Sequence, residues 1–134
     1  MADLGTGAGF PGLVVEIFNK NKAFHVKLYE KSPVKRKFLK SVIKELSLNA
    51  EVLGDLRDEV IDSEIIICRA FKKLDQIIQV SREIAKKPHK LMILKGQNAQ
   101  EEIKNSFKTK KYPYKLESSM TNKDSKIIVM EIEK

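Results

Sequence analysis

The hydrophobic pattern alternates between strand-like and helix-like segments along most of the chain. Residues 24–30 alternate apolar and polar side chains, which predicts a strand. Residues 33–46 predict a helix, because Ser32 suits an N-cap and Pro33 suits the first helical turn. This helix has an apolar stripe at helical spacing: Val34, Phe38, Val42 and Leu46.

The remaining segments continue the alternation. Further strands are expected over residues 50–55, 64–70, 90–96, 114–118 and 125–133, and further helices over residues 73–86 and 99–107. The run at 64–70 is almost continuously apolar, as in strands buried on both faces of a parallel sheet, and 90–96 predicts a second buried strand. The last two strands are joined by a short polar segment, which is typical of a β-hairpin.

Strands that alternate with helices predict an α/β fold with a doubly wound, mainly parallel sheet and right-handed crossovers. The C-terminal hairpin adds one antiparallel strand to that sheet. A length of 134 residues indicates a single domain. Such sheets bind ligands at the carboxyl ends of their strands, near the point where the strand order reverses.

The composition of the chain indicates a class of binding partner and a cellular compartment. The chain carries 26 basic and 18 acidic residues, and its net charge of +8 favours a polyanionic partner such as nucleic acid. One cysteine, Cys68, excludes an internal disulfide and suits the reducing cytoplasm. It lies in an apolar run, which predicts a buried, inert thiol. The sequence has no membrane-length apolar stretch and no signal peptide pattern, so we expect a soluble cytoplasmic protein.

The glycine-rich stretch DLGTGAGFPGL, at residues 3–13, predicts a ligand-binding loop. Gly5, Gly7 and Gly9 allow a tight turn and a close approach of the backbone to a ligand. Pro11 suits the start of a following helix, whose first amides would point at the ligand. A P-loop is excluded, because the sequence continues as PGLVV instead of Gly-Lys-Ser/Thr.

The spacing of this loop leaves two cofactors open. Gly7, Gly9 and Gly12 satisfy G-x-G-x-x-G, and Glu30 lies at the distance expected of an acid that binds a ribose. A dinucleotide and S-adenosylmethionine both fit that arrangement. The one-domain length leaves little room for a second nucleotide half or a substrate domain, and the hairpin suits a methyltransferase sheet. These two features favour S-adenosylmethionine.

Five motifs occur in order from residue 3 to about residue 97: DLGTGAGFPGL, KSPVKRKFL, LRDE, CRAF and LKGQ. Together they resemble the bacterial small-subunit ribosomal RNA methyltransferase G family, formerly the glucose-inhibited division protein B family. The resemblance implies a Rossmann-like class I methyltransferase that uses S-adenosylmethionine to methylate the seven-position nitrogen of one guanine in 16S ribosomal RNA. It also implies that residues 1–134 form the methyltransferase domain without the family's N-terminal region.

The resemblance assigns the cofactor site residue by residue: Gly5, Gly7, Gly9, Phe10, Glu30, Asp58, Glu59 and Arg69. Gly5 and Phe10 would contact the cofactor, and Glu30 would hold its ribose. Asp58 and Glu59 would lie near the adenine, although Asp58 departs from the small residue of the family. Arg69 would face the cofactor or its methionine carboxylate, with a structural ion pair as the competing role. Ser63-Glu64 replaces the usual Phe-Asp.

The implied reaction needs no general base, because the seven-position nitrogen of guanine has a lone pair and no proton to lose. The implied partner is small-subunit ribosomal RNA or the small ribosomal subunit, bound by a monomer. Candidate RNA contacts are Arg36, Lys40, Lys44, Lys110, Lys111 and Tyr112. For the first three residues an ordinary solvated helix face is an equally good interpretation. For the others the competing interpretation is a solvated loop with two tyrosines, Tyr112 and Tyr114, at the edge of the core. No metal ligands are expected.

Two other functions stay open at this stage. The chain is also compatible with an inactive cofactor- or RNA-binding fragment of the family. An NAD-dependent oxidoreductase is the third hypothesis, since the glycine spacing permits it.

Overall fold

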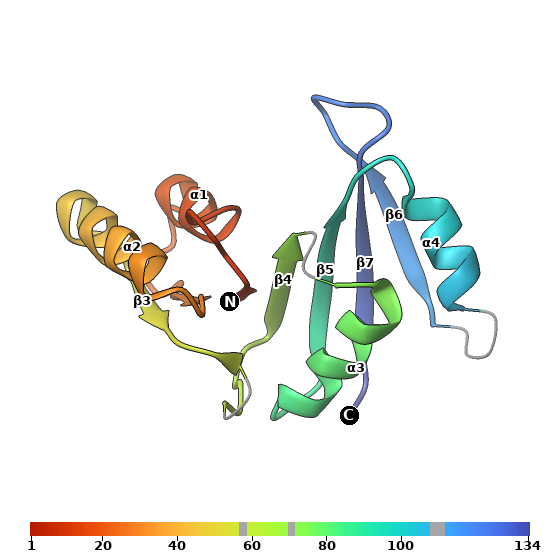
Figure 1. Cartoon of the computed structure of the whole chain (residues 1–134), viewed down its shortest axis with the longest axis horizontal. Coiled ribbons are helices and arrows are strands. Elements are labelled where there is room, and N and C mark those ends of the chain that lie inside the picture. The colour runs from red at the N-terminus through yellow and green to blue at the C-terminus, as the bar shows by residue number, and fades with distance from the viewer. Residues whose placement is uncertain (57–58, 70–71, 108–111) are drawn as a thin grey trace.

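A computed structural model of the chain describes all residues except 57–58, 70–71 and 108–111 (Figure 1). The strands are β1 (Ala2–Leu4), β2 (Val26–Tyr29), β3 (Ala50–Leu53), β4 (Ile65–Arg69), β5 (His89–Lys95), β6 (Tyr114–Ser118) and β7 (Lys126–Ile132). The helices are α1 (Gly12–Phe18), α2 (Pro33–Leu46), α3 (Leu74–Ile84) and α4 (Ala99–Ser106).

One seven-stranded sheet, in the order β3-β2-β1-β4-β5-β7-β6, organises the molecule. The first five strands are parallel, and β7 runs antiparallel between β5 and β6. The strand order reverses between β1 and β4, which places the expected ligand crevice at the carboxyl ends of these two strands. The predicted doubly wound sheet with a C-terminal antiparallel hairpin is therefore confirmed.

Helices α1 and α2 cover one face of the β1–β3 half of the sheet (Figure 1). Leu13 of α1 and Leu39 of α2 pack with Val26 and Leu28 of β2 in a small apolar core. Ser32 caps α2 as predicted, because its hydroxyl accepts a hydrogen bond from the Lys35 N–H at 3.4 Å.

Helices α3 and α4 cover the opposite face over the half that contains β4, β5 and β7 (Figure 1). The larger core lies there, and its fully buried side chains include Ile66, Leu74, Leu91 and Ile128. Cys68 belongs to this core as predicted, and burial raises the pKa of its thiol to about 12. Among the described residues no helix is long and apolar enough to span a membrane.

The predicted burial of both strand faces is confirmed for β4, where Ile66, Ile67 and Cys68 are all buried, but β5 is fully buried on one face only. On β5, Leu91 and Ile93 are fully buried, whereas Met92 points to the other face and is half-buried. Its pairing partners in register, Ile67 of β4 and Val129 of β7, lie on that same face. No described helix packs over this β5–β7 part of the face, because α1 and α2 follow β1 and β2, on the other side of the strand-order reversal.

The predicted apolar stripe of α2 is wrong at most positions. Val34 is 79% exposed, and Phe38 and Leu46 are 51% and 52% exposed. Leu39 is instead the buried residue of the helix. The four positions spread over about 120° of the helix surface, and the core lies instead on the side of Leu39, with Val42 and Ile43 packed against it.

Element ends otherwise lie close to the predicted ones. The shifts are one or two residues, as hydrogen-bond pairing decides where a strand stops. His89, which directly precedes the predicted strand at 90–96, is the buried first residue of β5.

Candidate functional site

The buried carboxylate of Asp3 holds the glycine loop in place by hydrogen bonds. Asp3 lies in β1 with no exposed surface, and its Oδ2 accepts hydrogen bonds from the Thr6 hydroxyl at 2.6 Å and from the Gly12 N–H at 2.8 Å. Burial raises the pKa of Asp3 above its ordinary value, against the opposing effects of these two hydrogen bonds and of the Arg69 charge. Asp3 Oδ1 is buried without a hydrogen-bond partner among the described residues.

The three glycines of the loop have the backbone conformation that the turn requires. Gly5, Gly7 and Gly9 have φ angles of 67°, 62° and 98°, which side chains strongly disfavour. A Cβ on Gly9 would lie 2.5 Å from Leu13 Cδ1, so this glycine is also needed for packing. A Cβ on Gly7 would meet nothing within 4 Å, so the loop is open there.

Glu30 ties the loop to the carboxyl end of β2. Its Oε2 accepts a hydrogen bond from the Gly7 N–H at 2.9 Å, and its Oε1 accepts one from the Ser32 N–H at 2.9 Å. The side chain is 7% exposed. Each oxygen keeps a second lone pair, which suits the two hydroxyls of a ribose. The structure thus brings together Glu30 and the glycine loop, as the sequence predicted.

Arg36 stabilises the backbone at Glu30 and Lys31. One guanidinium nitrogen, Nη1, donates to the carbonyl oxygens of Glu30 at 3.0 Å and Lys31 at 2.7 Å. These bonds fix the chain directly after β2, where the carboxylate of Glu30 must be held. Arg36 therefore has a structural role that the sequence analysis missed when it grouped this residue with the RNA-binding cations.

Arg69 and Phe10, which are also predicted cofactor contacts, lie at the same edge of the sheet. The Arg69 guanidinium carbon at the end of β4 lies 6.0 Å from the ring centroid of Phe10, whose side chain is 51% exposed. Burial, with added repulsion from Glu59 and Glu51, raises the pKa of Tyr29 to about 12. Asp58 lies outside the described residues.

The predicted RNA-binding residues fall in two segments that are far apart in sequence. Lys40 and Lys44 are exposed on α2, with no ion-pair partner among the described residues. Lys110 and Lys111 lie outside the described residues. The Tyr112 ring packs 5.6 Å from the Phe107 ring at the edge of the larger core, which matches the competing core-edge interpretation.

The chemistry of the loop separates the two cofactor hypotheses. A dinucleotide needs free amide donors for its pyrophosphate at the start of the following helix. Here the Gly12 N–H already donates to Asp3, which corrects the prediction that the first amides of this helix face a ligand. The buried carboxylate of Asp3 beneath the loop also disfavours a phosphate there, whereas Glu30 suits the ribose of either cofactor.

A family model described as rRNA small subunit methyltransferase G matches residues 1–129 of the chain. The match extends over nearly the whole sequence. The chain belongs to this family. It is 32% identical over 129 residues to the family member of Pelagibacter ubique, covering 93% of this chain and 61% of that protein. It is 40% identical over 131 residues to that of Mesoplasma florum, covering 92% of this chain and 52% of that protein.

The chain therefore spans about half to two thirds of the length of these two family members. Solved structures support the fold. A methyltransferase from Pyrococcus furiosus superposes with a TM-score of 0.73 at 12% identity, covering 97% of this chain and 73% of that one. TYW2 of M. jannaschii, in complex with AdoMet, gives a TM-score of 0.64 at 20% identity, covering 97% and 65%. At these identities the likeness shows the methyltransferase fold alone.

Within the family fold, Asp3 is the site residue that sequence reasoning missed. The available signal was a carboxylate inside an otherwise apolar strand directly before the glycines. A buried carboxylate requires hydrogen-bond donors, and the loop backbone is the nearest supply.

Proposed function

We propose that this chain binds S-adenosylmethionine and methylates the seven-position nitrogen of a guanine in small-subunit ribosomal RNA. The observation that carries the proposal is the pairing of Glu30 with the Gly7 amide at 2.9 Å, beside an open loop at the carboxyl end of β1. This geometry supports nucleoside binding, and membership of the methyltransferase G family supports the reaction and its RNA.

The cofactor would lie across the carboxyl ends of β1, β2 and β4. Gly5, Gly7 and Gly9 would let the backbone approach it, and Glu30 would accept hydrogen bonds from its ribose hydroxyls. Phe10, whose side chain is exposed on the loop, would cover one side of the cofactor. Arg69, at the end of β4, would pair with the methionine carboxylate.

The base-binding part of the cofactor site follows from the family resemblance. Asp58 and Glu59, between β3 and β4, would lie near the adenine. Glu59 is half-buried, and its negative charge helps to raise the pKa of Tyr29 at the end of β2. This supports a position for Glu59 close to Glu30, the proposed ribose-binding residue.

When bound, S-adenosylmethionine supplies an electrophilic methyl group on a positively charged sulfur. The protein would not need to remove a proton from the guanine, because its seven-position nitrogen already has a free lone pair. The chain's task is then to align the nitrogen with the methyl group and to keep water out of the site. Rigid anchors such as the Asp3 and Glu30 hydrogen bonds suit that task.

Contact with RNA phosphates would use the basic surface of the molecule. Lys40 and Lys44 are exposed on α2 and available for this role, and Lys110, Lys111 and Tyr112 are the second candidate segment. A net charge of +8 supports a polyanionic partner.

The test is to incubate the chain with small ribosomal subunits that lack the modification, using labelled S-adenosylmethionine, and to map the labelled base. A labelled guanine, methylated at its seven-position nitrogen, supports the proposal. Calorimetric titration with S-adenosylmethionine and NAD runs in parallel. Binding of S-adenosylmethionine without transfer would identify a cofactor-binding module instead, and binding of NAD alone would overturn the proposal.

A further inference from the structure

The exposed side of α2 carries positive charge that the helix itself does not need. Lys37, Lys40 and Lys44 are exposed, and none of them forms an ion pair within the part of the chain that the structure describes. From residue 33 to residue 44 the helix contains no acidic residue. Cations near the start of a helix oppose the helix dipole, so Lys35 and Lys37 do not stabilise α2 in this way. These lysines are available to a negatively charged partner.

Three of the lysines form one strip along the side of α2 that points away from the sheet. With about 100° between successive residues, Lys37 and Lys44 lie about 160° and 140° around the helix from the buried Leu39. Lys40 lies within about 60° of both lysines. The strip is therefore continuous and faces solvent.

An apolar strip lies next to the basic one. Val34 is 79% exposed and Phe38 is 51% exposed, and the two residues are one helical turn apart. Val34 lies about 60° from Lys37 around the helix, on the side away from Lys40, and Phe38 lies about 40° farther on. An exposed aromatic ring beside lysines is typical of surfaces that bind single-stranded nucleic acid, because bases stack on the ring while the lysines contact phosphates. The α2 surface is defined here as Val34, Lys37, Phe38, Lys40 and Lys44.

The α2 surface begins at the edge of the sheet where the cofactor site is proposed. Helix α2 connects the carboxyl end of β2, next to Glu30, to the amino end of the parallel strand β3 (Figure 1). Val34 therefore lies near the edge in the first turn of the helix, and Lys44 lies about 15 Å farther along its axis. An RNA strand that reaches the cofactor from this side would cross the α2 surface.

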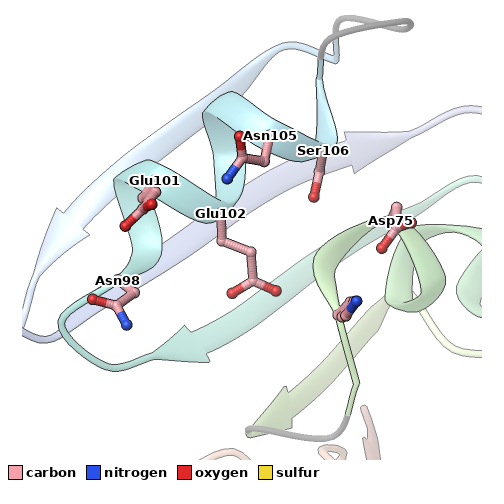
Figure 2. A pocket seen from close by; sticks show the side chains of 7 residues that line it. Asp75, Asn98, Glu101, Glu102, Asn105 and Ser106 are labelled. Atoms are coloured by element: carbon pink, nitrogen blue, oxygen red, sulfur yellow. The ribbon is translucent and has the colours of Figure 1, made fainter.

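The other side of the same edge, at the starts of α3 and α4, is mainly acidic. Three carboxylates and one ammonium group line a hollow of about 500 Å³ between these helices: Asp75, Glu101, Glu102 and Lys73. Figure 2 shows the three carboxylate side chains around this hollow. Glu102 is held by Lys95 at 3.0 Å and by the Leu74 N–H at 2.8 Å. The remaining carboxylates repel phosphates, which favours a path of the RNA over α2.

We propose that the α2 surface binds single-stranded RNA next to the target guanine, with its lysines on phosphates and Phe38 stacked on an unpaired base. The inference rests on the proposed function and deepens it, because it assigns the RNA that flanks the reactive base to one side of the edge. A duplex offers phosphates to the lysines but no free base for the ring, so Phe38 favours a single strand.

Two variants of the full chain test the two parts of the α2 surface, each with a matched control. The lysine variant is Lys37→Gln, Lys40→Gln and Lys44→Gln. Its control removes the same charge from exposed lysines on other segments: Lys20→Gln, Lys104→Gln and Lys123→Gln. The stacking variant is Phe38→Ala. Its control is Phe18→Ala, since Phe18 is 79% exposed at the end of α1.

Fluorescence anisotropy measures binding of a labelled single-stranded RNA of mixed sequence, and of the same RNA as a duplex, over a range of salt concentrations. Kinetics with undermodified small subunits give kcat and KM, and calorimetry gives the S-adenosylmethionine affinity. Melting temperatures verify that each variant is folded.

We expect the lysine variant to bind single-stranded RNA at least about tenfold more weakly than wild type. The slope of log affinity against log salt should fall by about two, because each phosphate contact with a single strand contributes about 0.7. Phe38→Ala should lower the single-strand affinity about tenfold, with an unchanged salt slope and unchanged duplex affinity, because the ring has no charge. Both variants should raise KM for small subunits and keep the S-adenosylmethionine affinity within about twofold of wild type. The two controls should stay within about threefold of wild type in RNA affinity and KM.

Three outcomes overturn the α2 surface. Equal losses of RNA affinity in the lysine variant and its control would show that net charge alone explains binding. An unchanged single-strand affinity in Phe38→Ala would exclude stacking on this ring. Weaker binding to small subunits with unchanged binding to free RNA would identify a ribosomal protein as the partner.

The same measurements separate this inference from the proposed function. An active wild type whose KM is unchanged in both variants overturns the α2 surface and leaves the proposed function standing. A wild type that binds single-stranded RNA through the α2 surface but transfers no methyl group overturns the proposed function and supports the surface.

Discussion

At the scale of single residues, two buried carboxylates explain how the glycine loop keeps its shape. Asp3 accepts from Thr6 and Gly12, and Glu30 accepts from Gly7 and Ser32. Burying a carboxylate is costly unless donors satisfy it, and here two of the four donors are backbone amides of residues 3–13, Gly7 and Gly12. The loop and its carboxylates therefore stabilise one another.

Glu30→Ala tests the ribose contact. We expect the S-adenosylmethionine affinity to fall about tenfold to a hundredfold, because hydrogen bonds to a charged group contribute about 1.5–3 kcal/mol. Isothermal titration calorimetry measures the change, and a melting curve verifies that the variant is folded. Glu51→Ala is the control, since Glu51 is an exposed carboxylate on the neighbouring strand β3. Equal S-adenosylmethionine affinities for Glu30→Ala and wild type would show that Glu30 does not bind the ribose.

At the scale of the elements, α2 shows how a helix can carry apolar residues that its core does not use. Leu39 is fully buried, with Val42 and Ile43 packed around the same core, whereas Val34 is 79% exposed. The helix is still well defined at its start, because Ser32 caps it and Pro33 occupies its first turn. Capping residues identify the helix, but they do not say which face is buried.

Leu39→Ala and Val34→Ala measure this difference. Leu39→Ala should lower the free energy of unfolding by about 2–5 kcal/mol, because it leaves a cavity in the smaller core. Val34→Ala should change it by no more than about 0.5 kcal/mol, as expected of an exposed position. Urea unfolding followed by circular dichroism provides both values. A larger loss for Val34→Ala would contradict the observed orientation of α2.

At the scale of the whole molecule, the sheet is covered unevenly. Helices α3 and α4 bury one face across β4, β5 and β7, and α1 and α2 cover the other face only across β1–β3 (Figure 1). Alternate residues of β5 therefore have different surroundings, even though residues 91–94 are all apolar. The burial of each face of β5 therefore depends on which helices pack against it and not on the composition of the strand.

Adjacent residues on β5 test the uneven cover. Ile93→Ala, on the fully buried face, should lower the free energy of unfolding by about 2–5 kcal/mol. Met92→Ala, on the half-buried face, should lower it by about 1 kcal/mol, since less apolar surface is withdrawn from water there. Denaturant titrations of both variants under one set of conditions give the comparison. Losses of equal size would show that both faces of β5 are buried.

The sequence by itself determined the order of strands and helices, the parallel sheet with its terminal hairpin, and the glycine loop with Glu30 at its side. These features depend on residues close together along the chain or on a short motif at fixed spacing, where backbone geometry leaves few alternatives. Only the tertiary structure decided which side of α2 is buried, which face of β5 is covered, that Asp3 takes up the Gly12 amide, and that Glu102 caps α3. The physical reason is that burial and hydrogen-bond partners depend on groups that lie far apart in sequence. Glu102 accepts a hydrogen bond from the Leu74 N–H because β4 and β5 end, and α3 and α4 begin, at one edge of the sheet, and no local pattern encodes that contact.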